Sequence, residues 1–163
     1  MRFLSGLILL ACLAGGSNAV AADAKIVKVL PHFLDAKGRH TLSPSLYERD
    51  AYQAQLRENP ELISALRFDI QWKARANRGE ELVLKMEVRG GKAGSKPLTL
   101  KEKVKGRGLF STWSKVSLSK EQFAAIGGVN AWRATLWKGD QQVNEMKSFL
   151  WSRNPVEKRG QTN

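Results

Sequence analysis

Apolar and polar residues alternate along most of the chain after residue 65, which is typical of strands that bury one face. The clearest example is residues 66–74, where Leu66, Phe68, Ile70, Trp72 and Ala74 alternate with polar side chains. Similar alternation or short apolar runs predict further strands at 26–30, 82–88, 98–104, 110–118, 132–136 and 142–151. Seven strands separated by turn signals predict a mainly β protein built as an antiparallel β-sandwich, although the pattern alone also fits a small barrel.

Two helices are predicted between these strands, each by a capping box at its start. The first, an N-terminal helical insertion, begins at Ser45-x-x-Glu48 and ends before Pro60. The second, a short helix before the penultimate strand, begins at Ser119-x-x-Gln122. The apolar side predicted for the first helix consists of Leu46, Tyr47, Ala51, Tyr52, Ala54 and Leu56. We expect that side to pack on the sandwich.

Residues 128–151 form a hairpin pattern: a strand with an aromatic and apolar face, a two-residue turn at Gly139-Asp140, and a strand closing on an aromatic pair. The alternation changes phase in the second strand, which predicts a bulge near Glu145. The segment resembles the closing hairpin of immunoglobulin-like or fibronectin-III-like domains in secreted bacterial proteins. The resemblance implies an Ig/FN3-like sandwich in a cell-envelope setting and implies no particular reaction. The chain lacks the paired cysteines of true immunoglobulin domains.

The N-terminus has the layout of a secretory signal peptide. Arg2 supplies a positive start, residues 3–13 form an apolar core, and Ala19-Val20-Ala21 matches a cleavage site. The apolar run is shorter than the roughly 20 residues needed to cross a bilayer, and no later stretch qualifies. The sequence therefore predicts an exported protein, periplasmic or extracellular. Its predicted parts are a signal peptide (1–21), an N-terminal strand, turn and helix packed on the sandwich (22–65), the sandwich body (66–151) and a polar tail (152–163).

Cys12 allows a second interpretation of the N-terminus. The run Leu9-Leu10-Ala11-Cys12 resembles the lipobox of bacterial lipoproteins, in which the cysteine becomes the lipidated first residue. Leu10 occupies a position that usually carries a smaller residue. The alternatives are therefore a lipoprotein anchored through Cys12 or a signal peptide in which Cys12 is one more apolar core residue.

The remaining residues exclude several kinds of site. A single cysteine excludes a disulfide framework and a cysteine-based zinc site. His32 and His40 have no further ligand or nucleophile at a useful spacing, so we expect them to be ordinary surface or partly buried residues. Gly90-Gly91 lacks the helix and Lys-Ser/Thr pair of a phosphate-binding loop. We therefore expect a non-catalytic protein with no cofactor and no metal ion.

Tryptophans are frequent enough to suggest a sugar-binding platform, but their parity argues against one. Trp72 and Trp132 lie on apolar strand faces, so we expect them in the core. Trp113 and Trp137 have the opposite parity from the apolar residues of their strands, so we expect them to face outward. In a fibronectin-like strand order these two lie in different sheets and do not form one surface.

Basic residues are unevenly distributed along the chain. There are 27 Lys and Arg against 15 Asp and Glu, a formal net charge of +12, and residues 92–163 hold 14 basic and five acidic residues. Lys101, Lys103 and Lys105 recur every second residue and so share one strand face, and Arg107 continues the row. In a sandwich, the neighbouring strands add Lys85, Arg89, Arg133 and Trp137 to that face.

Two interpretations of this basic face remain open. Lysines on an edge strand discourage edge-to-edge pairing and improve solubility. They also form a surface for an anionic partner, which in an exported protein is an acidic polysaccharide, a lipid head group or an acidic protein, with no nucleic acid expected. The second interpretation predicts an exported, non-catalytic envelope binding module. The alternative is a structural or accessory subunit that docks on a larger exported assembly.

Signal-peptide cleavage gives the first testable prediction. We expect the exported protein to begin at Ala22, or at Val20 if cleavage follows Ser17-Asn18-Ala19, because a small-x-small site follows the apolar run. Mass spectrometry of exported material measures the mature N-terminus directly. A lipid-modified N-terminal Cys12 would contradict this prediction and identify a lipoprotein.

Overall fold

The computed structural model describes residues 24–75, 81–106 and 108–152. The predicted signal peptide, Cys12, Arg107 and the polar tail from residue 153 lie outside these residues. The elements in chain order are β1 Ala24–Leu34, α1 Leu46–Glu58, η1 Pro60–Leu62, β2 Ala65–Ala74, β3 Glu81–Gly90, β4 Leu98–Lys105, β5 Gly108–Ser119, α2 Lys120–Ala125, β6 Val129–Lys138, β7 Gln141–Lys147 and η2 Phe149–Ser152.

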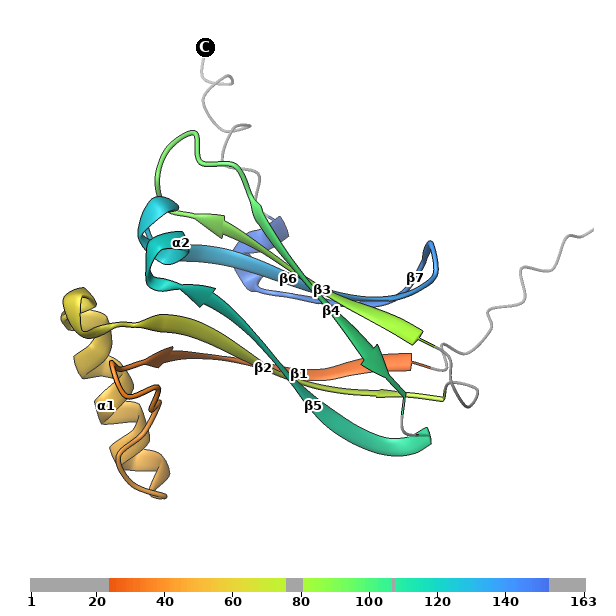
Figure 1. The fold of residues 1–163 in the computed structure, drawn as a ribbon, viewed down its shortest axis with the longest axis horizontal. Coiled ribbons are helices and arrows are strands. Elements are labelled where there is room, and N and C mark those ends of the chain that lie inside the picture. The colour runs from red at the N-terminus through yellow and green to blue at the C-terminus, as the bar shows by residue number, and fades with distance from the viewer. Residues whose placement is uncertain (1–23, 76–80, 107, 153–163) are drawn as a thin grey trace, which may run out of the picture.

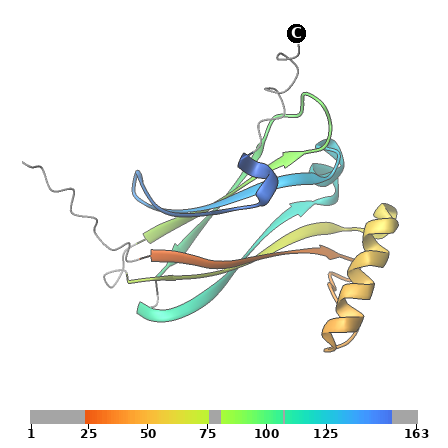
Figure 2. The same ribbon diagram turned by 180° about the vertical axis from the view of Figure 1, so that it is seen from behind.

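The described residues confirm a mainly β protein with seven strands in two antiparallel sheets. One sheet has the order β1-β2-β5 and the other has the order β4-β3-β6-β7. The two sheets lie one above the other with their strands running in similar directions, and α1 lies at one end (Figures 1 and 2). Because the strands divide into two separate sheets, the predicted sandwich is right and the small barrel is wrong.

Alternation along β2 and β3 builds the core between the sheets. Phe68, Ile70 and Trp72 point inward from β2 and are at most 1% exposed, and the inner residues of β3 are at most 2% exposed. The indole Nε1 of Trp72 donates a hydrogen bond to Ser114 Oγ at 3.1 Å, so its polar atom is satisfied inside the core. The predicted inner face of residues 66–74 is therefore confirmed.

Both predicted helix starts are present. Ser45 caps α1 by accepting a hydrogen bond from the Glu48 N–H, and Ser119 and Gln122 form both bonds of a capping box at α2. After α2, Gly127 has φ +69°, a left-handed conformation that strains other residues. These local signals were sufficient to predict where both helices begin.

The predicted buried side of α1 is right only in part. Leu56 is buried and Tyr52 and Ala54 are partly buried, as predicted, but Leu46 and Tyr47 are 67% and 85% exposed. The polar Gln53, which was not predicted, is also buried. The reason is that α1 docks against the edge of β1 through a polar side chain. Gln53 Oε1 accepts from the Phe33 N–H at 2.8 Å, and Gln53 Nε2 donates to the Phe33 carbonyl at 2.9 Å. The amide thus takes the place of a neighbouring strand.

The closing hairpin has the predicted two-residue turn, because Lys138 pairs with Gln141 around Gly139-Asp140. Leu136 pairs with Asn144 and Trp137 with Gln142, so the extra residue of the bulge is Val143, two positions before the predicted place. The inward positions therefore change parity at this point in the strand.

The last strand is shorter than predicted. It ends at Lys147 rather than at Trp151, and residues 149–152 form the turn η2. Ser148 is fixed to β6, because its Oγ accepts from the Trp132 N–H at 2.9 Å and its own N–H donates to the Trp132 carbonyl. Beyond this anchor the chain turns and places Trp151 at 8% exposure against β6 and β3.

Truncating the central tryptophan tests the core. We expect Trp72→Ala to lower the free energy of unfolding by about 3–5 kcal/mol, because it removes a fully buried aromatic side chain. Trp113→Ala is the matched control, since Trp113 is 47% exposed on the outer face of the same sheet, and we expect a change of about 0.5 kcal/mol or less. Chemical denaturation measures both. Equal effects of the two substitutions would contradict the observed strand register.

Candidate functional site

The predicted basic face lies on the outside of the four-stranded sheet. Lys101 is opposite Lys85, Lys103 is opposite Val83, and Lys105 is opposite Glu81 on β3. The three lysines of β4 are exposed, and Lys85 is partly exposed. We call Lys85, Lys101, Lys103 and Lys105 the lysine patch. The sandwich register thus places these four ammonium groups on one surface.

Acidic groups neutralise little of the lysine patch. Lys103 Nζ lies 3.2 Å from Glu81 Oε2, but both side chains are more than half exposed, so the pair is weak. In the part of the chain that the structure describes, Lys101 and Lys105 form no ion pair. Glu102 is opposite the buried Leu84 and has an oxygen shielded from solvent on the inner side, where burial raises the pKa of its carboxyl group. It therefore does not offset the outer charges directly.

Trp137 joins the lysine patch, whereas Arg133 does not. The ammonium of Lys85 lies 3.5 Å from the centroid of the Trp137 ring, which is a cation–π contact. Arg133 lies 2.7 Å from Glu87 and 3.7 Å from Glu145, so its charge is already compensated. The sequence could not show this, because the pairing depends on which strands are neighbours.

Trp151 covers the other half of the same sheet face. The guanidinium of Arg89 lies 3.9 Å from the ring centroid and that of Arg133 lies 5.0 Å away. Arg89 Nη1 also donates to the Trp151 carbonyl at 3.1 Å. Of the three arginines predicted for the basic face, Arg89 and Arg133 contact η2 and Arg107 lies outside the described residues, so the exposed cations lie toward β4.

The tryptophans form no shared platform. Trp113 lies on β5 and is paired in the three-stranded sheet, whereas Trp137 lies on β6 in the four-stranded sheet. Both are outside the core, as predicted. Trp132 lies on the inner face as predicted, but it is only partly buried and lines a groove between the sheets.

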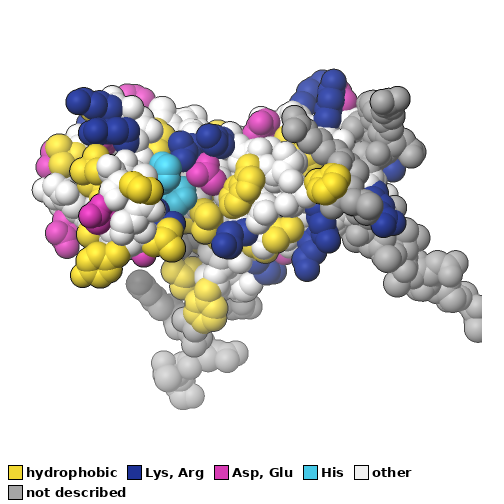
Figure 3. Space-filling view, turned by 90° about the horizontal axis from the view of Figure 1, so that it is seen from below, with side chains coloured by type: hydrophobic (Ala, Val, Ile, Leu, Met, Phe, Trp, Pro, Cys, Tyr) yellow, Lys and Arg dark blue, Asp and Glu magenta, His cyan; other side chains and the backbone are white. Residues whose placement is uncertain are grey.

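The structure brings together two histidines, His32 and His40, for which no shared site was predicted. The rings of His32 and His40 lie 4.8 Å apart, on the outer side of the three-stranded sheet. His32 Nε2 is 3.7 Å from Asp69 Oδ2, and Arg67 Nη2 donates to the same oxygen at 2.9 Å. Figure 3 shows the histidines at the surface, with charged side chains beside them. The partners come from β2, so spacing near His32 and His40 could not reveal them.

The loop that carries His40 is fixed by Asp35. Its carboxylate accepts hydrogen bonds from the Lys37 and Arg39 N–H groups, the Arg39 guanidinium and the Tyr52 hydroxyl, all at 2.8 Å. Burial raises the pKa of Asp35, but these hydrogen bonds outweigh burial and hold it well below its usual range. The loop between β1 and α1 therefore has a defined conformation.

Burial is the main cause of the lowered pKa values of His32 and His40. For His40 the neighbouring guanidinium of Arg67 adds to this effect, and for both rings Asp69 opposes it. Both imidazoles are therefore largely neutral near pH 7. Among the described residues, no three His, Cys, Asp or Glu side chains are grouped closely enough to hold a metal ion.

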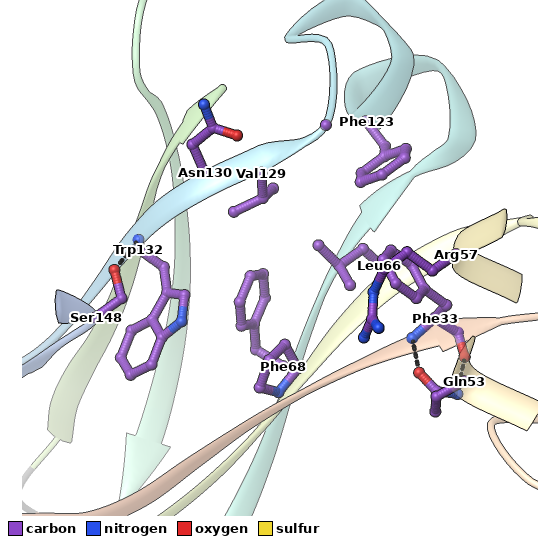
Figure 4. Close-up of a pocket in the computed structure, with 12 residues that line it drawn as sticks. Phe33, Gln53, Arg57, Leu66, Phe68, Phe123, Val129, Asn130, Trp132 and Ser148 are labelled. Carbon is purple, nitrogen blue, oxygen red and sulfur yellow. Dashed lines mark hydrogen bonds between the residues drawn. The ribbon is translucent and has the colours of Figure 1, made fainter. Parts of the chain in front are cut away.

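A groove of about 410 Å³ opens between the two sheets beside α1 and α2 (Figure 4). Its walls are mainly apolar, with polar groups from Arg57, Gln53, Asn130 and Ser148 at its borders. We call it the aromatic groove, after four of its lining residues: Phe33, Phe68, Phe123 and Trp132. The sequence predicted Phe68 and Trp132 in strands and Phe123 in a helix, but Phe33 lay outside the predicted first strand (26–30), which in the structure continues to Leu34. No pattern indicated that the sheets separate here.

Comparison with known proteins gives no assignment. No protein-family model matches the chain, and no curated protein matches it in sequence. Among solved structures, one similarity is to a β-glucosidase from Kluyveromyces marxianus, with a TM-score of 0.32 and 11% identity over 52% of this chain and 12% of that one. A match of this quality does not bear on function. None of the described helices is long and apolar enough to span a membrane.

The histidine cluster predicts a pH effect on stability. Because both histidine pKa values are lowered, below about pH 6.5 the unfolded chain binds protons that the folded protein does not. The free energy of unfolding should therefore fall as the pH falls through this value. The charged groups around the rings are Asp69, Arg67, Arg49 and Lys115.

Replacing both rings by glutamine in a His32→Gln/His40→Gln variant should flatten this part of the profile. Denaturation at several pH values between about 7.5 and 5 measures the slope, which is informative even if the variant is less stable at every pH. Parallel profiles for the variant and the wild type would contradict the prediction.

Proposed function

We propose that this protein is an exported, non-catalytic binding module of the cell envelope that recognises an anionic partner through the lysine patch. The observation that carries the proposal is the common exposed face of Lys101, Lys103 and Lys105 beside Lys85. An acidic polysaccharide is the partner that best fits a row of cations along an extended strand, since its charges also repeat along a line. Binding of an acidic protein or of a lipid head group to the same patch is the other possible outcome of a binding test.

The strand order supports an Ig/FN3-like identity for the sandwich. In fibronectin-III-like domains the fourth strand pairs with the third, so that three strands face four. The same arrangement is found here in β1-β2-β5 and β4-β3-β6-β7. The proposed envelope setting rests on the signal-peptide pattern and on the resemblance of residues 128–151 to secreted domains.

Charge spacing favours binding over edge protection alone. Alternate residues of a strand are separated by about 6.5–7 Å, which is within the roughly 8 Å over which exposed charges act at physiological ionic strength. The lysines therefore reinforce one another's potential. Edge protection requires charge only on the edge strand β4, yet Lys85 and Trp137 extend the patch onto β3 and β6.

An exposed apolar surface favours the alternative of an accessory subunit. Leu42, Leu46 and Tyr47 are 61%, 67% and 85% exposed near the start of α1. Figure 3 shows hydrophobic side chains gathered at this end of the molecule. Neighbouring exposed apolar groups are typical of protein–protein contacts. Under this alternative, α1 is the element that meets the larger assembly.

Heparin chromatography tests the lysine patch. We expect Lys101→Gln/Lys103→Gln/Lys105→Gln to elute at clearly lower salt than the wild type, because three reinforcing charges are removed from one face. The matched control is Lys25→Gln/Lys28→Gln/Lys73→Gln, which removes three exposed lysines from β1 and β2 in the other sheet.

Both triple variants have the same net charge, so an effect of net charge alone would lower the salt concentration of elution equally for both. The lysine patch predicts a larger shift for the β4 variant. Equal elution of the two variants, or elution of the β4 variant with the wild type, would contradict the proposed function. Circular dichroism checks that both variants remain folded, as expected for substitutions outside the core.

A further inference from the structure

We propose that the aromatic groove is a second binding site, independent of the lysine patch, and that it takes a small aromatic carboxylate. The groove combines an aromatic interior with one cation at its border. These two features select a planar apolar body carrying a negative charge.

The groove exists because the two sheets separate at the α1 end. At the other end β1 is tied to the opposite sheet, where Asn144 Oδ1 accepts from the Ile26 N–H at 2.9 Å. β7 ends at Lys147 and does not continue alongside the rest of β1. Inner side chains such as Phe33 and Trp132 are therefore left only partly covered. Uncovered aromatic surface gains free energy when a ligand excludes water from it.

The ring arrangement favours an aromatic ligand over a flexible chain. Phe33 and Phe123 already pack edge to face, with ring centroids 5.8 Å apart. Figure 4 shows the partly exposed Trp132 indole directed toward the space from the opposite side, with the fully buried Phe68 ring next to it. A flat ligand placed between these two sides can stack on one wall and meet ring edges on the other.

Arg57 provides the cation. It lies in the last turn of α1, and its guanidinium carbon is 5.8 Å from the Phe33 ring centroid. Figure 4 shows the guanidinium directed into the groove rather than away from it. Within the described ranges it forms no ion pair with a carboxylate, so its donors remain available. A guanidinium binds a carboxylate with two parallel hydrogen bonds.

The other polar groups at the border are mostly occupied by the protein itself. Gln53 bonds to the backbone of Phe33, and Ser148 bonds to the backbone of Trp132. Arg57 is therefore the group that distinguishes a charged ligand from a neutral one. The volume of about 410 Å³ is at the small end of ligand pockets, so it suits one or two fused rings and not a polymer.

Calorimetry with a charged and a neutral probe tests the site. We expect 2-naphthoate to bind the wild type more tightly than 2-naphthamide, which has the same ring system without the charge. Arg57→Gln should weaken naphthoate binding about tenfold, the effect of one lost charge-assisted contact, and leave naphthamide nearly unchanged. Arg49→Gln is the matched control, since Arg49 lies on the same helix but pairs with Asp50 outside the groove.

Indole N–H resonances locate the bound probe. The chain has five tryptophans, and only Trp132 lines the groove. Naphthoate should shift the Trp132 indole signal and leave those of Trp113 and Trp137 in place. Val129→Phe, which fills the groove, should abolish this shift while the other indole signals show an intact fold.

Two results would overturn the inference. One is the absence of any shift of the Trp132 indole signal at millimolar naphthoate. The other is an equal loss of affinity for naphthoate and for naphthamide in Arg57→Gln. Neither result affects the lysine patch, because its residues lie on the outer face of the four-stranded sheet and none lines the groove.

Discussion

The shared core between β2 and β3 sets the position of every surface in this protein. Phe68 and Trp72 from one sheet and Leu84 and Met86 from the other belong to a single buried cluster and are at most 1% exposed. Because successive strand residues point to opposite sides, burial of these positions directs their neighbours outward. A slip of one residue would turn Lys85 inward in β3, or Arg67 and Asp69 inward in β2, and the cost of burying those charges excludes it.

The same constraint explains what the sequence could predict. The existence of each strand, the inner faces and the helix starts depend on local alternation and on capping residues such as Ser45 and Ser119, so they were predicted correctly, whereas the ends of β1 and β7 were not. In α1 the apolar pattern predicted the buried Leu56, but it could not predict the buried Gln53, whose amide bonds to the edge of β1. The histidine cluster joins His40 to Arg67, 27 positions apart, and no local pattern records such a contact.

Three of the four edge strands, β1, β4 and β7, are protected in different ways, which bears on the meaning of the lysines. Gln53 satisfies the backbone of β1 near α1, and Val143 forms a bulge in β7. β4 carries exposed lysines outside and Glu102 on its inner side, both of which discourage pairing with another strand. Edge protection on β4 is therefore already provided from both faces, yet Lys85 adds a further cation on a strand that is not an edge. This excess of charge is what a binding surface requires and edge protection does not.

The short segment that follows β7, residues 148–151, affects both proposed sites. Ser148 bonds to Trp132 on β6, and the chain then leaves the sheet and places Trp151 between Arg89 and Arg133. Had the strand continued alongside β1, it would have covered the aromatic groove, and Arg89 would have lacked its contact with Trp151, whereas Arg133 would still pair with Glu87 and Glu145. The turn therefore uncovers aromatic surface between the sheets and engages cations outside them. On the outer face of the four-stranded sheet it leaves the exposed cations to the lysine patch, and between the sheets it leaves the groove open with Arg57 at its border.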